Sequence, residues 1–125
     1  MQIYKNSAFC KWANDNNIED HVFSQVVHEV KDGLFDANLG GNVYKKRLPL
    51  DGKGKRGGAR TILAFKKQDK VFFLYALKKN KQASVTPKEL QALKSLAKLY
   101  FSLSDKQLKQ AVENGVLFKV EDNNG

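Results

Sequence analysis

The chain has 125 residues, of which 42% are hydrophobic, and a formal net charge of +9. That length is usual for a single domain, and the apolar content is sufficient for a hydrophobic core. No apolar run reaches 18 residues and no signal-peptide pattern is present, which predicts a cytoplasmic protein without a membrane segment. The one cysteine, Cys10, excludes an internal disulfide and a thiolate metal cluster.

The first third of the chain predicts a short strand followed by two helices. The strand is expected at residues 3–4, and Asn6 or Ser7 can cap the first helix. The second helix is expected at about 19–32 and should end at Gly33. Apolar residues recur in it at three- and four-residue spacing, as amphipathic helices require: Val22, Phe23, Val26, Val27 and Val30.

The middle of the chain predicts three strands in succession. Residues 34–42 are expected to form a connection, and the first of the strands follows at 43–48. Residues 49–58 contain four glycines and a proline, which favours a loop. The other two strands are expected at 59–65 and 71–77. The last of these is apolar on both faces and should therefore lie in the centre of the sheet.

The last third of the chain predicts two capped helices and a final extended segment. Thr86 to Glu89 has the sequence of a capping box with proline at the first helical position. Ser104 to Gln107 repeats the capping pattern for a second helix. Residues 116–120 then resemble a terminal strand.

Positive charge is concentrated in residues 43–81. That segment has thirteen Lys and Arg residues against Asp51 and Asp69, a net charge of +11, while the rest of the chain is close to neutral at −2. A charge that served solubility alone would be spread over the chain with both signs mixed. The distribution therefore predicts a binding site for a polyanion, and we interpret the segment as an RNA-contacting surface.

Two glycine-rich stretches in and beside this segment resemble a known family. Residues 40–45 have the sequence Gly-Gly-Asn-Val-Tyr-Lys, and residues 52–60 have Gly-Lys-Gly-Lys-Arg-Gly-Gly-Ala-Arg. With the order of two helices, three strands and a helix, they resemble the RelE superfamily of bacterial toxins. The closest branch is the RelE/HigB type with an extended Gly-Lys-rich loop, where serine is commoner at the position of Arg56. The resemblance covers about Ala8 to Leu117.

This resemblance implies the toxin of a type II toxin–antitoxin system. Such toxins cleave mRNA in the ribosomal A site, where the 2′-OH of the message attacks the adjacent phosphate without a metal or other cofactor. The implied partners are the ribosome, mRNA and a cognate antitoxin with a helix-turn-helix DNA-binding domain. The implied fold is α+β, an antiparallel sheet of three to four strands packed against two N-terminal helices and C-terminal helices. Residues 1–125 would form one domain, with a helical extension at about 103–125.

Acid–base catalysis in this chain would depend on lysines. The only histidines, His21 and His28, lie seven residues apart on one helix, away from the basic segment, and form no metal-binding pattern. Lys45 and Arg47 are two residues apart on a strand and share a face, whereas Lys46 points the other way. The family resemblance makes this pair catalytic, with one residue as the general base. The alternative is a solvated strand face.

The resemblance also assigns the remaining site residues. Arg60 matches the arginine that clamps the reacting phosphate, and its planar fork suits phosphorane oxygens. A structural salt bridge is the alternative for Arg60. A base on the leaving-group side would come from Lys78, Lys79 or Lys81 after the third strand; we assign Lys79 as catalytic, with the other two as open alternatives. The expected RNA-binding residues are Lys53, Lys55, Arg56, Lys78 and Lys81.

One aromatic position of the family has no counterpart here. The tyrosine that stacks on a base is replaced in the stretch Ser84 to Thr86. Tyr75 is expected in the core, and the alternative is that it faces the groove and stacks on a base. Two other functions stay open at this stage. A ParE-like gyrase poison would share the fold without cleaving RNA, and a non-catalytic RNA-binding module would expose aromatic platforms beside its basic residues.

Overall fold

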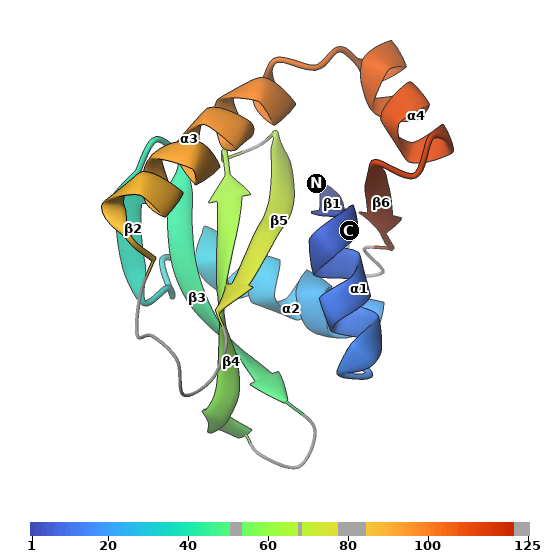
Figure 1. Cartoon of the computed structure of the whole chain (residues 1–125). Coiled ribbons are helices and arrows are strands. Elements are labelled where there is room, and N and C mark those ends of the chain that lie inside the picture. Colours follow the sequence, from blue (N-terminus) through green and yellow to red (C-terminus); the bar gives the residue numbers. More distant parts are fainter. Residues whose placement is uncertain (51–53, 68, 78–84, 122–125) are drawn as a thin grey trace.

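The computed structural model describes residues 1–50, 54–67, 69–77 and 85–121, with the backbone alone for 54–57 (Figure 1). The described strands are β1 (Gln2–Asn6), β2 (Ala37–Gly40), β3 (Val43–Leu50), β4 (Gly54–Phe65), β5 (Lys70–Leu77) and β6 (Leu117–Val120). The described helices are α1 (Ser7–Asp15), α2 (Asp20–Lys31), α3 (Pro87–Phe101) and α4 (Asp105–Glu113). No helix in these ranges is long and apolar enough to cross a membrane.

The strands form one sheet in the order β2-β3-β4-β5-β1-β6. Neighbouring strands are antiparallel except β1 and β5, which pair in parallel. The α+β class is therefore confirmed, and β5 lies inside the sheet as its apolar sequence predicts. The sheet is larger than the three to four strands expected, because β1 adds to β5 and the short β2 and β6 form the two edges.

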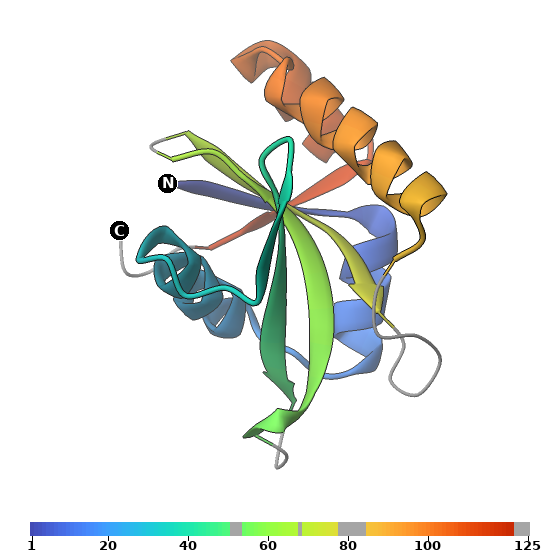
Figure 2. The same cartoon turned by 90° about the vertical axis from the view of Figure 1, so that its left-hand side faces the viewer.

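Two segments that we expected to be loops between elements are partly β-strand. Residues 34–42 include β2, which pairs with β3 through a tight turn at Gly40 and Gly41. Residues 49–58, expected as a glycine-rich loop, mostly continue β3 and β4, and Leu50 still pairs with Gly54 after a bulge. Proline and glycine are tolerated at such bulges, so their presence did not end the strands. Figures 1 and 2 show the ends of β3 and β4 projecting beyond the helices.

The helix starts follow the capping signals. The Asn6 side chain accepts a hydrogen bond from the backbone N–H of Phe9 at 2.8 Å and caps α1. Thr86 and Glu89 form the expected capping box of α3, with Pro87 in its first turn. Ser104 forms an equivalent box at the start of α4. These local bonds satisfy backbone N–H groups that have no partner within the helix.

The sheet separates two hydrophobic clusters. One includes Phe9, Phe23 and Phe73, and it joins α1 and α2 to one face. The other includes Ile62, Phe72 and residues of α3 and α4, which cover part of the opposite face. Figure 2 shows α2 and α3 on opposite sides of the β3–β4 strands. Each face of the sheet thus has its own helical cover.

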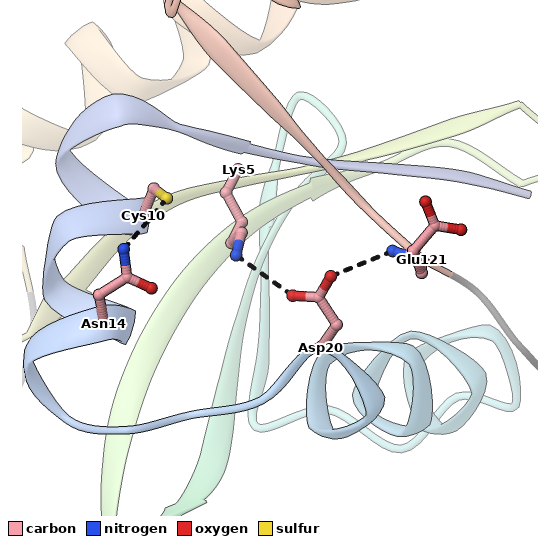
Figure 3. Close-up of polar contacts among 5 residues, drawn as sticks. All are labelled: Lys5, Cys10, Asn14, Asp20 and Glu121. Carbon is pink, nitrogen blue, oxygen red and sulfur yellow. Dashed lines mark hydrogen bonds and ion pairs between the residues drawn. The ribbon is translucent and has the colours of Figure 1, made fainter.

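The C-terminal segment is joined to the sheet by β6, which pairs with β1. Leu108 of α4 and Leu117 of β6 are both buried in the cluster beside α3. On the other face, the Asp20 carboxylate at the start of α2 contacts Lys5 Nζ at 3.4 Å and accepts a hydrogen bond from the Glu121 backbone N–H at 3.3 Å (Figure 3). The expected extension at about 103–125 therefore contributes to the core.

Candidate functional site

Two rows of residues run across β3, β4 and β5 where the basic segment was expected to converge. In the first row Arg47 lies opposite Arg60, and Arg60 lies opposite Leu77. In the second, Lys45 lies opposite Ile62, and Ile62 opposite Tyr75. Residues paired in this way have Cβ atoms about 4.5–5.5 Å apart. Three basic residues from two strands thus occupy neighbouring positions.

The three basic residues share the face of the sheet that carries α3. Val43 and Ile62 belong to the cluster beneath α3, and side chains two residues apart in a strand point to the same face. Lys45, Arg47 and Arg60 follow that alternation. They are all half-buried. The prediction that Lys45 and Arg47 share a face is therefore confirmed.

Lys46 points to the opposite face, as expected, and is part of the fold there. Its side chain is 6% exposed, and its Nζ atom lies 2.9 Å from Glu29 Oε1 of α2. A buried ammonium requires such a partner because transfer from water is costly. The same helix carries His21 and His28, which lie on the opposite side of the sheet from Arg60, but His21 lines a hollow with Pro49 and Leu50 and so is not away from the whole basic segment.

Arg47 and Arg60 are two positively charged residues directly opposite each other in the sheet. Like charges directly opposite each other in a sheet are destabilising by about 0.2–1 kcal/mol. The Arg47 Nε atom lies 4.0 Å from Asp36 Oδ2, and both side chains are 37% exposed. This acidic neighbour was missed by sequence reasoning because β2, the strand that follows it, was not predicted. The apolar–polar alternation of residues 35–39 before two glycines was the available signal.

Tyr75 lies beside these basic residues because of a bulge in β5. The pairing of β4 with β5 shifts between Ile62 and Leu63, and Leu74 and Tyr75 both contact the cluster under α3. Tyr75 is half-buried, and it lines a hollow of about 200 Å³ with Glu89 and residues of α3. It packs against the core as expected, but at the margin of the face that carries Lys45.

The other predicted site residues have no described side chain. Lys53, Lys78, Lys79 and Lys81 lie outside the described residues. Lys55 and Arg56 lie in β4, where the backbone alone is described. Within the described ranges, no group of three or more His, Cys, Asp and Glu residues is arranged to hold a metal ion.

A comparison with protein families identifies the family of the chain. The family model described as the RelE toxin of the RelE/RelB toxin–antitoxin system matches residues 1–120. Comparisons with curated proteins and with solved structures yield no match. The matched range includes every described strand and helix, together with the three basic residues that share the α3 face. The chain therefore belongs to the RelE toxin family: it is the toxin of a toxin–antitoxin system, and its partner is a cognate antitoxin.

Proposed function

We propose that this toxin is a ribosome-dependent endoribonuclease that inhibits translation by cleaving mRNA. The observation that carries the proposal is the placement of Arg47 opposite Arg60, with Lys45 one row away on the same face. This placement brings positive charge from two strands together on one face, where the planar guanidinium groups can bind phosphate oxygens. Membership in the RelE family also supports RNA as the target, because RelE toxins are typically endoribonucleases.

The proposed reaction uses the 2′-OH of the message as its nucleophile. Lys45 in its neutral form accepts the proton of that hydroxyl, and the 2′ oxygen attacks the adjacent phosphorus. Arg60, with Arg47, binds the equatorial oxygens on which negative charge develops. The bond from phosphorus to the 5′ oxygen then breaks, and Lys79 donates a proton to that oxygen. The products are a 2′,3′-cyclic phosphate and a 5′-OH, and the step requires no metal or cofactor.

Binding to the ribosome would involve further basic residues. Lys55 and Arg56 lie at the start of β4, which projects from the body of the protein together with the end of β3, and Lys53 precedes them in the sequence (Figure 1). We assign them, with Lys78 and Lys81, to contacts with RNA phosphates. The antitoxin, which we expect to have a helix-turn-helix DNA-binding domain, would cover the toxin and prevent these contacts.

Induction in cells, with and without the antitoxin, tests this proposal. Wild-type chain should arrest growth, and co-expressed antitoxin should relieve the arrest. The double variant Lys45→Ala, Arg60→Ala should lose toxicity while it keeps the wild-type circular dichroism spectrum. A control that removes two exposed lysines elsewhere, Lys31→Ala with Lys106→Ala, should remain toxic.

Two outcomes would contradict the proposal. Full toxicity of a folded Lys45→Ala, Arg60→Ala variant would show that the site is assigned wrongly. Intact mRNA together with DNA damage after induction would indicate a gyrase poison. Growth arrest with neither effect would indicate an RNA-binding module that blocks translation without cleavage.

A further inference from the structure

A second group of lysines borders a hollow at the other end of α3. The hollow has a volume of about 610 Å³ and lies between α3, the turn from β2 to β3, and the end of β4. Its basic lining residues are Lys66, Lys94 and Lys98, and its lining contains no acidic residue. None of these lysines belongs to the basic group around Arg60.

The turn before β3 shapes this hollow. Gly40 and Gly41 have φ angles of +87° and +60°, which side chains other than glycine rarely adopt. A Cβ atom on Gly41 would lie 3.3 Å from Lys94 Cγ, so the two glycines let α3 approach the turn closely. The stem of Lys94 is thereby held against the backbone. Lys94 lines the hollow, and its Nζ atom lies 3.2 Å from where a Cβ atom on Gly40 would be.

An aromatic ring forms the other side of the hollow. Phe101 lines it, and the ring centroid lies 5.4 Å from that of Phe72 in the core. Lys66 Nζ lies 6.0 Å from the Phe101 centroid. The Phe101 ring thus packs against the core residue Phe72 and lies near the ammonium group of Lys66.

The charge of the three lysines is not compensated within the described part of the chain. Lys94 and Lys98 are four residues apart on α3, a spacing at which like charges are destabilising. None of the ion pairs of the described residues includes Lys66, Lys94 or Lys98. By contrast, Lys46 and Arg47 each have an acidic neighbour. The hollow is therefore a site where an external anion would relieve repulsion.

We propose that this hollow binds the phosphodiester backbone of a structured RNA, as a contact separate from the site of cleavage. Lysines attract phosphates, the side-chain amides of Asn42 and Gln91 can donate hydrogen bonds, and Phe101 offers a surface for base stacking. An acidic peptide would use the lysines but would leave the ring without a role. The choice of RNA rests on the proposed function, since a toxin that acts on the ribosome meets ribosomal RNA.

The hollow is too far from Arg60 to belong to the same small ligand site. Lys66, which lines the hollow, follows Phe65, and Phe65 is five residues from Arg60 along β4, which corresponds to about 17 Å in a strand. An extended RNA surface can contact both regions. Loss of the hollow should therefore weaken RNA binding without removing the catalytic groups.

The test uses the full chain and an RNA hairpin with 2′-O-methyl groups, which cannot be cleaved by 2′-OH attack. Variant Lys66→Gln, Lys94→Gln, Lys98→Gln is compared with a control of equal charge, Lys31→Gln, Lys106→Gln, Lys109→Gln. Each phosphate contact contributes about 0.7–0.9 to the slope of log affinity against log salt. The hollow variant should reduce that slope by about 2, and the control should leave it unchanged. Lys98→Gln alone, whose side chain is exposed, should reduce it by about 1.

Poly-glutamate and inorganic phosphate serve as further probes. Equal loss of RNA binding in the hollow variant and the control would overturn the proposal, because net charge alone would then explain it. Loss of poly-glutamate binding with unchanged RNA binding would indicate an acidic protein partner instead. Phosphate binding that the variant abolishes, with RNA affinity unchanged, would indicate a free anion. Because the hairpin cannot be cleaved, these results are independent of whether Lys45 and Arg60 catalyse cleavage.

Discussion

Lys45 and Lys46 are adjacent in β3 but point to opposite faces, so the same substitution should affect different properties. Lys46→Met removes the ammonium that lies 2.9 Å from Glu29 Oε1 and retains most of the side-chain stem. The Glu29 side chain is only 21% exposed, so this substitution would take the ammonium away from a largely buried carboxyl group. Removing one member of a buried pair costs about 3–5 kcal/mol, and the partial exposure of Glu29 favours the lower end, about 3 kcal/mol. In a domain of this size, that loss lowers the Tm by about 10 °C.

Lys45→Met should give the converse result. Its free energy of unfolding should stay within about 0.5 kcal/mol of wild type, as is usual for substitutions outside the core, while toxicity is lost. Urea denaturation followed by circular dichroism measures stability, and growth after induction measures toxicity. Adding Glu29→Gln to Lys46→Met should recover more than half of the lost stability, because it removes the buried carboxyl group that has lost the Lys46 ammonium. The reasoning is refuted if Lys46→Met unfolds with wild-type stability, or if Lys45→Met is as destabilising as Lys46→Met.

Three further predictions concern the arginine pair, a helix cap and the buried tyrosines. A double-mutant cycle with Arg47→Gln and Arg60→Gln should show that the two arginines repel each other by about 0.2–1 kcal/mol in the free energy of unfolding. This repulsion should decrease as salt is added. A coupling that is zero or favourable would contradict it. Thr86→Ala should lower the free energy of unfolding by about 1 kcal/mol in urea, since it removes the capping box, whereas an unchanged midpoint would show that the box is dispensable. Burial raises the pKa of Tyr4 and of Tyr100 above the ordinary 10.0, so folding favours the neutral phenols. The contribution of these two tyrosines to stability is present below pH 10 and is lost as pH rises through their folded-state pKa. Phenolate absorbance measures the titration of tyrosine in the folded chain and in the urea-unfolded chain. Identical titration midpoints in the two states would contradict the prediction.

The elements that could be predicted from sequence are those with local signals. The caps at Asn6, Thr86 and Ser104 each depend on residues no more than three positions away, and all three are present. Apolar periodicity likewise located α2, and the two-sided apolar run located β5 inside the sheet. Alternation along β3 correctly separated Lys45 and Arg47 from Lys46.

The features that were missed depend on contacts between distant parts of the chain. The parallel pairing of β1 with β5 joins residues nearly 70 positions apart, for which no local pattern exists. The strand pairing of Leu50 with Gly54 overrides a sequence that is rich in turn residues. The bulge that places Tyr75 on the face of Lys45 arises from strand register, and the partner of Lys46, Glu29, comes from another element.

Mapping of RNA ends after induction shows whether the toxin cleaves mRNA on the ribosome. Total RNA is collected within minutes of inducing either wild-type chain or the Lys45→Ala, Arg60→Ala variant, and new 5′ ends are sequenced by ligation specific for 5′-OH groups. Ribosome-dependent cleavage predicts new 5′-OH ends within translated reading frames for wild type, none for the variant, and loss of the ends when translation initiation is blocked beforehand. New ends that are equally abundant in untranslated RNA, or intact mRNA in growth-arrested cells, would contradict it.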